Sequence, residues 1–158
     1  MLRITLIAIS VTFAAGLLFV NYYNSVVDAV NWAASIPGSI ATTRQYYSVA
    51  HPGTFFRIAS PLNQLFALIT VIACWKFGRA RYFAIGALVL AISADLLTFG
   101  YFYPRLDIMF HSPISNTEAI RQAVADWSSM NWVRSGICAV SVICTMSALV
   151  ITVKKSSI

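Results

Sequence analysis

The segment VNYYNSVVDAVNW, residues 20–32, decides how the chain is organised. The seventeen residues 4–20, which lead into it, contain no charged side chain. Four polar side chains recur at spacings of three, four and three residues: Asn21, Asn24, Asp28 and Asn31. On a helix this spacing forms one stripe. Unpaired amides and carboxylates are costly in hydrocarbon, so the segment predicts one wall of a polar chamber at the end of a membrane-spanning helix.

Composition indicates a membrane protein. Of 158 residues, 59% are hydrophobic and 10% are charged, whereas a soluble domain has about 25% charged residues. Four segments reach the roughly twenty apolar residues that a bilayer requires. We therefore predict an all-α, integral-membrane four-helix bundle in a single transmembrane domain, residues 1–158. Its spans are expected at about 4–34, 55–76, 81–103 and 127–153, with outer loops at 37–53 and 104–126.

The distribution of charge predicts the orientation of the bundle. With four spans, the start of the chain, the turn at 76–81 and the end of the chain share one side. That side carries six cations and no acid: Arg3, Lys76, Arg79, Arg81, Lys154 and Lys155. The positive-inside rule places both termini in the cytoplasm. This distribution, rather than a nucleic-acid partner, explains the net charge of +6. We expect an uncleaved first span, because removing it as a signal peptide would break the charge balance.

Polar residues at the outer end of every expected span define the candidate site. Asp95 falls inside the outer half of the third span, where a carboxylate must be paired or protonated. It either forms an ion pair with Arg134 or acts as a proton acceptor. We assign Asp95 and Arg134 as the candidate catalytic residues. The candidate ligand-binding residues, some of which would instead join helices, are Asn24, Asp28, Arg57, Asn63, Asn131, Trp127 and Tyr101.

Aromatic side chains are concentrated at the same outer end, for example at Tyr22, Tyr23, Tyr46 and Tyr47. Such residues suit a flat amphipathic ligand such as a quinone or a phenol. His51 and His111 lie in the outer loops without the spacing of a metal site, so no metal ligand is assigned. No motif identifies a cofactor.

Three short motifs carry a resemblance to a known family. They are Ala15–Gly16 in the first span, Phe55-Phe56-Arg57 with Pro61 at the entry to the second, and Trp127-x3-Asn131-x2-Arg134 at the entry to the fourth. With them the chain resembles the four-span membrane family of unknown function that includes fungal anthrone oxygenases, in a bacterial branch without an assigned activity. Family members often carry W-x3-H-x2-R at the last place, and Asn131 stands where the histidine would be. The resemblance implies a four-helix membrane bundle and the oxygenation of a phenolic substrate.

Two functions remain open at this point. The first is a multi-pass protein of the bacterial inner membrane with an outward-facing polar-aromatic pocket, acting as an oxygenase-like oxidoreductase or as a binding protein for a quinone- or phenol-like molecule. The alternative is a non-catalytic subunit or assembly factor of a larger membrane complex. In that case partner subunits would pack on the small residues of the fourth span, which are Gly136, Ala139, Ser141, Ser147 and Ala148.

Overall fold

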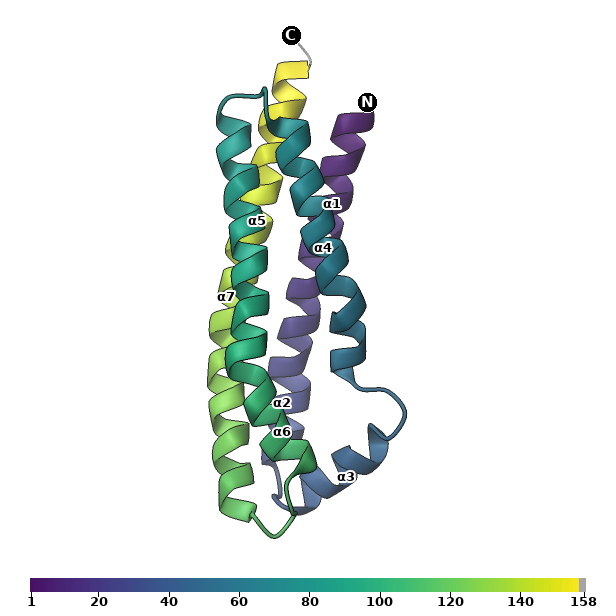
Figure 1. Ribbon diagram of the computed structural model, residues 1–158, viewed down its shortest axis with the longest axis vertical. Coiled ribbons are helices and arrows are strands. Elements are labelled where there is room, and N and C mark those ends of the chain that lie inside the picture. Colours follow the sequence, from purple (N-terminus) through teal and green to yellow (C-terminus); the bar gives the residue numbers. More distant parts are fainter. Residues whose placement is uncertain (157–158) are drawn as a thin grey trace.

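The computed structural model describes residues 1–156, and every regular element in that range is a helix. Figure 1 shows long antiparallel rods, with both chain ends at the same end of the bundle. Four helical stretches are long and apolar enough to cross a membrane: Leu2–Ala33, Pro52–Cys74, Arg79–His111 and Thr117–Lys155. This confirms the predicted all-α class and the four candidate spans, and it indicates a multi-pass membrane protein.

The first rod consists of α1 (Leu2–Tyr23), the π-helical turn η1 (Asn24–Asp28) and α2 (Ala29–Ala33). A short helix, α3 (Gly38–Tyr46), connects it to the second rod, α4 (Pro52–Cys74). The third rod consists of α5 (Arg79–Leu97), a second π-helical turn η2 (Thr98–Phe102) and α6 (Tyr103–His111). The fourth rod is the single helix α7 (Thr117–Ser156).

Local sequence explains where α4 begins and how it connects to α5. His51 is the N-cap of α4, and its Nδ1 accepts the Gly53 N–H at 3.1 Å. Pro52 follows in the first turn, where its missing N–H has no intrahelical partner to lose. At the other end Gly78 has φ of +49°, a conformation that side chains with a Cβ rarely adopt. Gly78 therefore allows the tight turn between α4 and α5.

Small residues bring the rods together. The buried face of α5 is a row of alanines at spacings of four and three: Ala80, Ala84, Ala87, Ala91 and Ala94. Small side chains let membrane helices approach closely, and Ser141 Oγ of α7 donates to the Ala87 carbonyl at 3.2 Å. Ser141 and Ala148 are buried in this contact region and the adjacent core, at 5% and 0% exposure. The expectation that these two residues face a partner subunit is therefore wrong.

The π-helical turn η1 breaks the polar stripe predicted for the first rod. A π turn holds roughly one more residue than an α turn, so positions beyond it rotate relative to those before it. Ser25 within the turn and Ala29 and Trp32 beyond it are buried, in place of the predicted Asp28 and Asn31. Asn31 is exposed and donates to the Val27 carbonyl of its own helix at 2.9 Å. The prediction of one continuous stripe is wrong for this reason.

The second outer loop is shorter than expected. Much of the expected loop 104–126 is helical, because α6 continues to His111 and α7 begins at Thr117. The segment 119–126, which was expected in this loop, is part of α7 and runs directly into the fourth rod. At this end Trp127 packs edge-on against Trp32 and Phe102, with ring centroids 4.9 Å and 5.7 Å away. These rings form a core that holds α2, η2 and α7 together.

Candidate functional site

The polar residues predicted to line one cup are divided between two compartments. The first, which we name the polar chamber, is a cavity of about 40 Å³ inside the bundle. Its polar lining comes from all four rods: Asn21, Ser60, Asn63, Asp95, Thr98, Arg134 and Ser141. The second, which we name the tyrosine groove, is an open cavity of about 380 Å³ between the first rod and the segment that leads into α4. The residues that give it its chemistry are Tyr23, Asn24, Asp28, Tyr46, Tyr47, His51 and Phe55.

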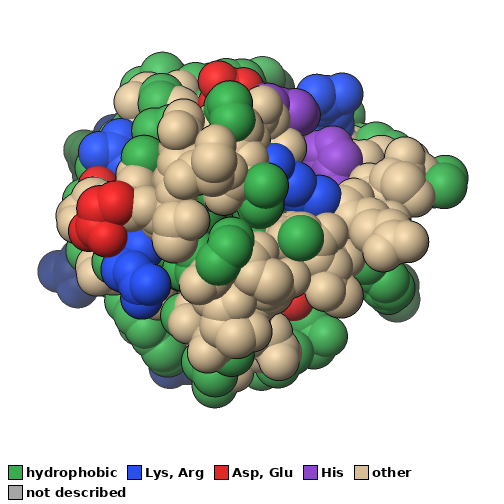
Figure 2. Space-filling view, turned by 90° about the horizontal axis from the view of Figure 1, so that it is seen from below, with side chains coloured by type: hydrophobic (Ala, Val, Ile, Leu, Met, Phe, Trp, Pro, Cys, Tyr) green, Lys and Arg blue, Asp and Glu red, His purple; other side chains and the backbone are tan. Residues whose placement is uncertain are grey.

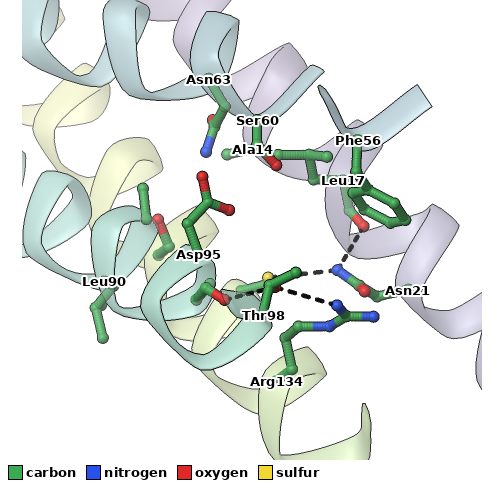
Figure 3. A pocket seen from close by; sticks show the side chains of 14 residues that line it. Ala14, Leu17, Asn21, Phe56, Ser60, Asn63, Leu90, Asp95, Thr98 and Arg134 are labelled. Carbon is green, nitrogen blue, oxygen red and sulfur yellow. Dashed lines mark hydrogen bonds between the residues drawn. The ribbon is translucent and has the colours of Figure 1, made fainter. Parts of the chain in front are cut away.

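Asp95 projects into the polar chamber from α5. Figure 3 shows its carboxylate and the Asn63 side chain of α4 pointing toward one another. The Gln64 amide Nε2 donates to Asp95 Oδ2 at 2.5 Å. Within the part of the chain that the structure describes, Asp95 forms no direct ion pair with Arg134. The reading of Asp95 and Arg134 as a helix-locking ion pair is therefore wrong, and an amide holds the carboxylate instead.

Arg134 enters the polar chamber from α7 and is 6% exposed. Its Nη1 donates to Thr98 Oγ1 at 3.3 Å, and its Nη2 donates to Asn131 Oδ1 at 2.5 Å. The guanidinium carbon lies 4.1 Å from the centre of the Phe102 ring, which places the cation on an aromatic face. Its Nε is buried without a hydrogen-bond acceptor. Arg134 is thus held by side chains of the third rod and by its own helix.

Asn131 joins the fourth rod to the first. It is fully buried, and its Nδ2 donates to the Asn21 carbonyl at 3.0 Å and to Ser25 Oγ at 2.6 Å. Its Oδ1 accepts from Arg134. The Asn131 amide therefore uses its hydrogen bonds to join helices, as buried amides commonly do in membrane proteins.

The tyrosine groove lies at the end of the bundle opposite the chain termini. Figure 2 looks onto this end, where acidic, basic and histidine side chains lie among hydrophobic ones. The turn η1 supplies Asn24 and Asp28 to the groove, and the segment after α3 supplies His51. Tyr46 and Tyr47 contribute neighbouring rings with centroids 5.4 Å apart. The groove therefore combines aromatic surface with a carboxylate, an amide and an imidazole.

Electrostatics connects Tyr47 to Asp28. Burial raises the pKa of the Tyr47 hydroxyl to about 12, and the nearby negative charge of Asp28 contributes to the rise. The negative charge of Asp28 opposes the ionisation of the Tyr47 hydroxyl. Tyr47 consequently stays neutral, as a hydrogen-bonding group, over the physiological range of pH.

The structure sorts the candidate residues into three groups. The polar chamber contains Asn63, Asp95 and Arg134. The tyrosine groove contains Asn24 and Asp28. The remaining four, which line neither compartment, are Arg57, Tyr101, Trp127 and Asn131.

The residues outside both compartments have other surroundings. Arg57 is exposed near the start of α4. Tyr101 lies under the Arg105 guanidinium, whose carbon is 3.5 Å from the ring centre.

His51 lines the tyrosine groove but was not a candidate binding residue in the sequence analysis. Its position before Pro52 at the start of a span is the pattern of a helix N-cap, and that pattern was the available signal.

Volume separates what the two compartments can hold. A water molecule needs about 10–15 Å³ of cavity volume. The polar chamber, at about 40 Å³, therefore accommodates roughly three waters and is too small for an aromatic ring. Ligand pockets in proteins span about 300–1,000 Å³, and the tyrosine groove at about 380 Å³ is within that range. A ring-sized ligand and Asp95 therefore do not share a compartment in this structure.

Comparison of the chain with protein-family models, with curated proteins and with solved structures gave no match. The resemblance to the family of the anthrone oxygenases stays a prediction from short motifs. The function is therefore inferred from the two compartments themselves.

Proposed function

We propose that this multi-pass membrane protein binds a small phenol- or quinone-like molecule in the tyrosine groove. The observation that supports the proposal is the make-up of the groove, in which four aromatic side chains border an open cavity of about 380 Å³ together with Asn24, Asp28 and His51. Aromatic walls with a few polar groups are the usual construction of a small-molecule site.

The polar groups of the groove offer both kinds of hydrogen bond. Asp28 is an acceptor when ionised, and the Asn24 amide supplies a donor and an acceptor. His51 Nδ1 already accepts from the Gly53 N–H, so a neutral His51 carries its proton on Nε2 and can donate it. A ligand with one hydroxyl and one flat ring would satisfy these groups while its ring packs on tyrosine faces.

The carboxylate favours a phenol over a quinone. An ionised Asp28 attracts an O–H group and repels the lone pairs of a quinone carbonyl. A quinone would have to place its carbonyl on Asn24 or His51 instead. We therefore expect hydroxyl-bearing rings to bind more tightly than the oxidised forms of the same rings.

The proposal includes the orientation of the bundle. Both termini and the α4–α5 turn lie at the end opposite the groove (Figure 1), and this end carries the six cations without an acid. The positive-inside rule then favours cytoplasmic termini. The groove would open near the outer face of the bacterial inner membrane and admit amphipathic molecules from the lipid interface.

The test is a binding measurement with 4-ethylphenol on purified protein in uncharged detergent, read by calorimetry. Removing one aromatic wall with Tyr47→Leu should weaken binding about 2- to 12-fold, which corresponds to the 0.5–1.5 kcal/mol of an aromatic contact. The matched control is Tyr82→Leu, because Tyr82 is 64% exposed at the opposite end of the bundle. Equal binding by both variants and the native protein would mean that 4-ethylphenol enters the micelle and not the groove.

A further inference from the structure

Asp28 differs from every other acid in the protein. The chain contains five acidic residues, and all five lie in the described range. Four have a polar partner: Asp95 with Gln64, Asp107 with His111, Glu118 with Arg121, and Asp126 with Arg105 and Gln122. Asp28 has neither a hydrogen-bond donor nor a cation beside it within residues 1–156. It is also half-buried, unlike the exposed Asp107 and Glu118.

An unpaired carboxylate in this position is unfavourable. Partial burial at the end of a membrane span removes water from the charge, and a buried charge is normally paired. The cations at this end of the bundle do not supply the pair. Arg44 points its Nε and Nη2 at the Met109 carbonyl, at 3.0 Å and 2.7 Å. His51 uses its Nδ1 to accept the Gly53 N–H. The described residues therefore leave this carboxylate free to accept a cation from outside the chain.

The π-helical turn of the backbone places Asp28 in the tyrosine groove. Asn24 and Asp28 are the first and last residues of the π-helical turn η1, and both line the tyrosine groove. Without the extra residue of this turn, Asp28 would continue the buried polar stripe toward the fourth rod, one turn after Asn24. Single π turns inside α-helices are frequent at functional sites. The turn thus brings the carboxylate to the groove and away from the amide network around Asn131.

The surroundings of the carboxylate are those of a cation site. Tyr23, Tyr46, Tyr47 and Phe55 line the same cavity. Aromatic faces attract ammonium groups through the ring quadrupole, and aromatic cages recognise organic cations in this way. A nearby carboxylate adds a full opposite charge. An inorganic metal ion is a poorer fit, because no group of three or more metal-binding side chains occurs among the described residues.

We propose that the natural ligand of the tyrosine groove is a phenol-like amine, with Asp28 as the counter-ion of its ammonium group. This inference rests on the proposed function, that the groove binds a phenol-like molecule, and it specifies the charge of that molecule. Asn24 and His51 then remain as partners for the hydroxyl group. Anionic phenols are excluded by the same carboxylate.

The test compares three phenols that share one ring and differ in charge: 4-ethylphenol, tyramine and 3-(4-hydroxyphenyl)propionate. At neutral pH the first is neutral, the second carries an ammonium group and the third a carboxylate. We expect tyramine to bind the native protein about tenfold more tightly than 4-ethylphenol, the ratio for a desolvated cation–π contact with an opposite charge. The propionate should bind more weakly than 4-ethylphenol.

Two variants assign the preference to Asp28. Asp28→Asn keeps the size of the side chain and removes its charge, so the affinities for tyramine and 4-ethylphenol should come within about twofold of each other. A helical circular dichroism spectrum equal to that of the native protein shows that this variant is folded. Asp107→Asn is the matched control, because Asp107 is at the same end but its side chain is 77% exposed. That variant should keep the full preference for tyramine.

The outcomes separate the two levels of the proposal. If 4-ethylphenol and tyramine bind equally well to the native protein, the charge assignment is wrong and the phenol site stands. If Asp28→Asn retains the preference for tyramine, Asp28 is not the counter-ion. If none of the three compounds binds better to the native protein than to Tyr47→Leu, the proposed function itself fails.

Discussion

Replacing Asn131 by alanine should destabilise the bundle more than any equivalent change at the other asparagines of the outer half. Asn131 makes three hydrogen bonds in a site with no exposure: two donated to Asn21 O and Ser25 Oγ, and one accepted from Arg134. The substitution removes all three. It also leaves the Arg134 Nη2 without its acceptor, next to an Nε that already has none.

The expected magnitude follows from the type of each bond. Interhelical hydrogen bonds in membrane proteins contribute about 0.6 kcal/mol on average, with about 1.7 kcal/mol at the upper end. The two bonds that Asn131 donates therefore account for about 1 to 3 kcal/mol. The bond from the charged Arg134 contributes about 1.5–3 kcal/mol. We expect Asn131→Ala to lower the free energy of unfolding by about 3–5 kcal/mol, a factor of roughly 150 to 5,000 in the folding equilibrium.

The assay is reversible unfolding in mixed micelles with increasing dodecyl sulfate, followed by circular dichroism. Asn31→Ala is the matched control, because Asn31 is exposed and bonds only to its own helix. Exposed substitutions of this kind change stability by about 0.5 kcal/mol or less. The reasoning is refuted if Asn131→Ala costs less than about 1 kcal/mol. Equal losses for the two variants would in addition contradict the change of register at η1.

Three further predictions concern other parts of the molecule. Tyr47 should ionise at a pH of about 12, so its neutral form stabilises the fold fully below about pH 10 and this contribution is lost as the pH rises toward 12. The difference in tyrosinate absorbance between the native protein and Tyr47→Phe measures this ionisation, and Asp28→Asn should move it to lower pH. Ala87→Leu, at a position 1% exposed against α7, should cost about 1–3 kcal/mol by overpacking in the same unfolding assay, whereas Val89→Leu, 55% exposed on the surface of the bundle, should be nearly neutral. A fluorescent protein fused to the C-terminus should fluoresce, and a periplasm-dependent phosphatase fused there should be inactive; the reverse result would contradict cytoplasmic termini.

The fold class followed from local properties of the chain. Twenty apolar residues have few ways to satisfy their backbone in hydrocarbon other than as a helix. The four spans could therefore be located from composition alone, although the fourth helix begins ten residues before the expected span, at Thr117. The same reasoning underestimated the third rod. Its helix runs past Pro104 to His111, because a proline in the first turn of α6 does not interrupt the bonds of that turn.

The sequence predicted which residue types would form the candidate site but not which of them would lie together. Polar side chains at the ends of the spans could be recognised, and so could the excess of tyrosine at that end. Whether Asp95 and Asp28 share one cavity could not, because periodicity assumes an unbroken α-helix. Each π turn adds one residue and redirects everything beyond it, and no pattern in the sequence marks η1 or η2.

The sequence by itself thus determined that the chain forms four membrane-spanning helices with polar and aromatic residues gathered at one end, since these properties depend on composition and helical period. Only the tertiary structure decided which polar groups meet. Asn131 donates a hydrogen bond to the first rod, and Asp95 accepts one from Gln64. The hydrogen-bonding capacity of these two side chains is therefore used inside the bundle. The π-helical turn η1 directs Asp28 into the open tyrosine groove, where the described residues give its carboxylate no hydrogen-bond or ion-pair partner. The physical reason is that pairing depends on the direction of each side chain, which the register of the helices and their packing fix together.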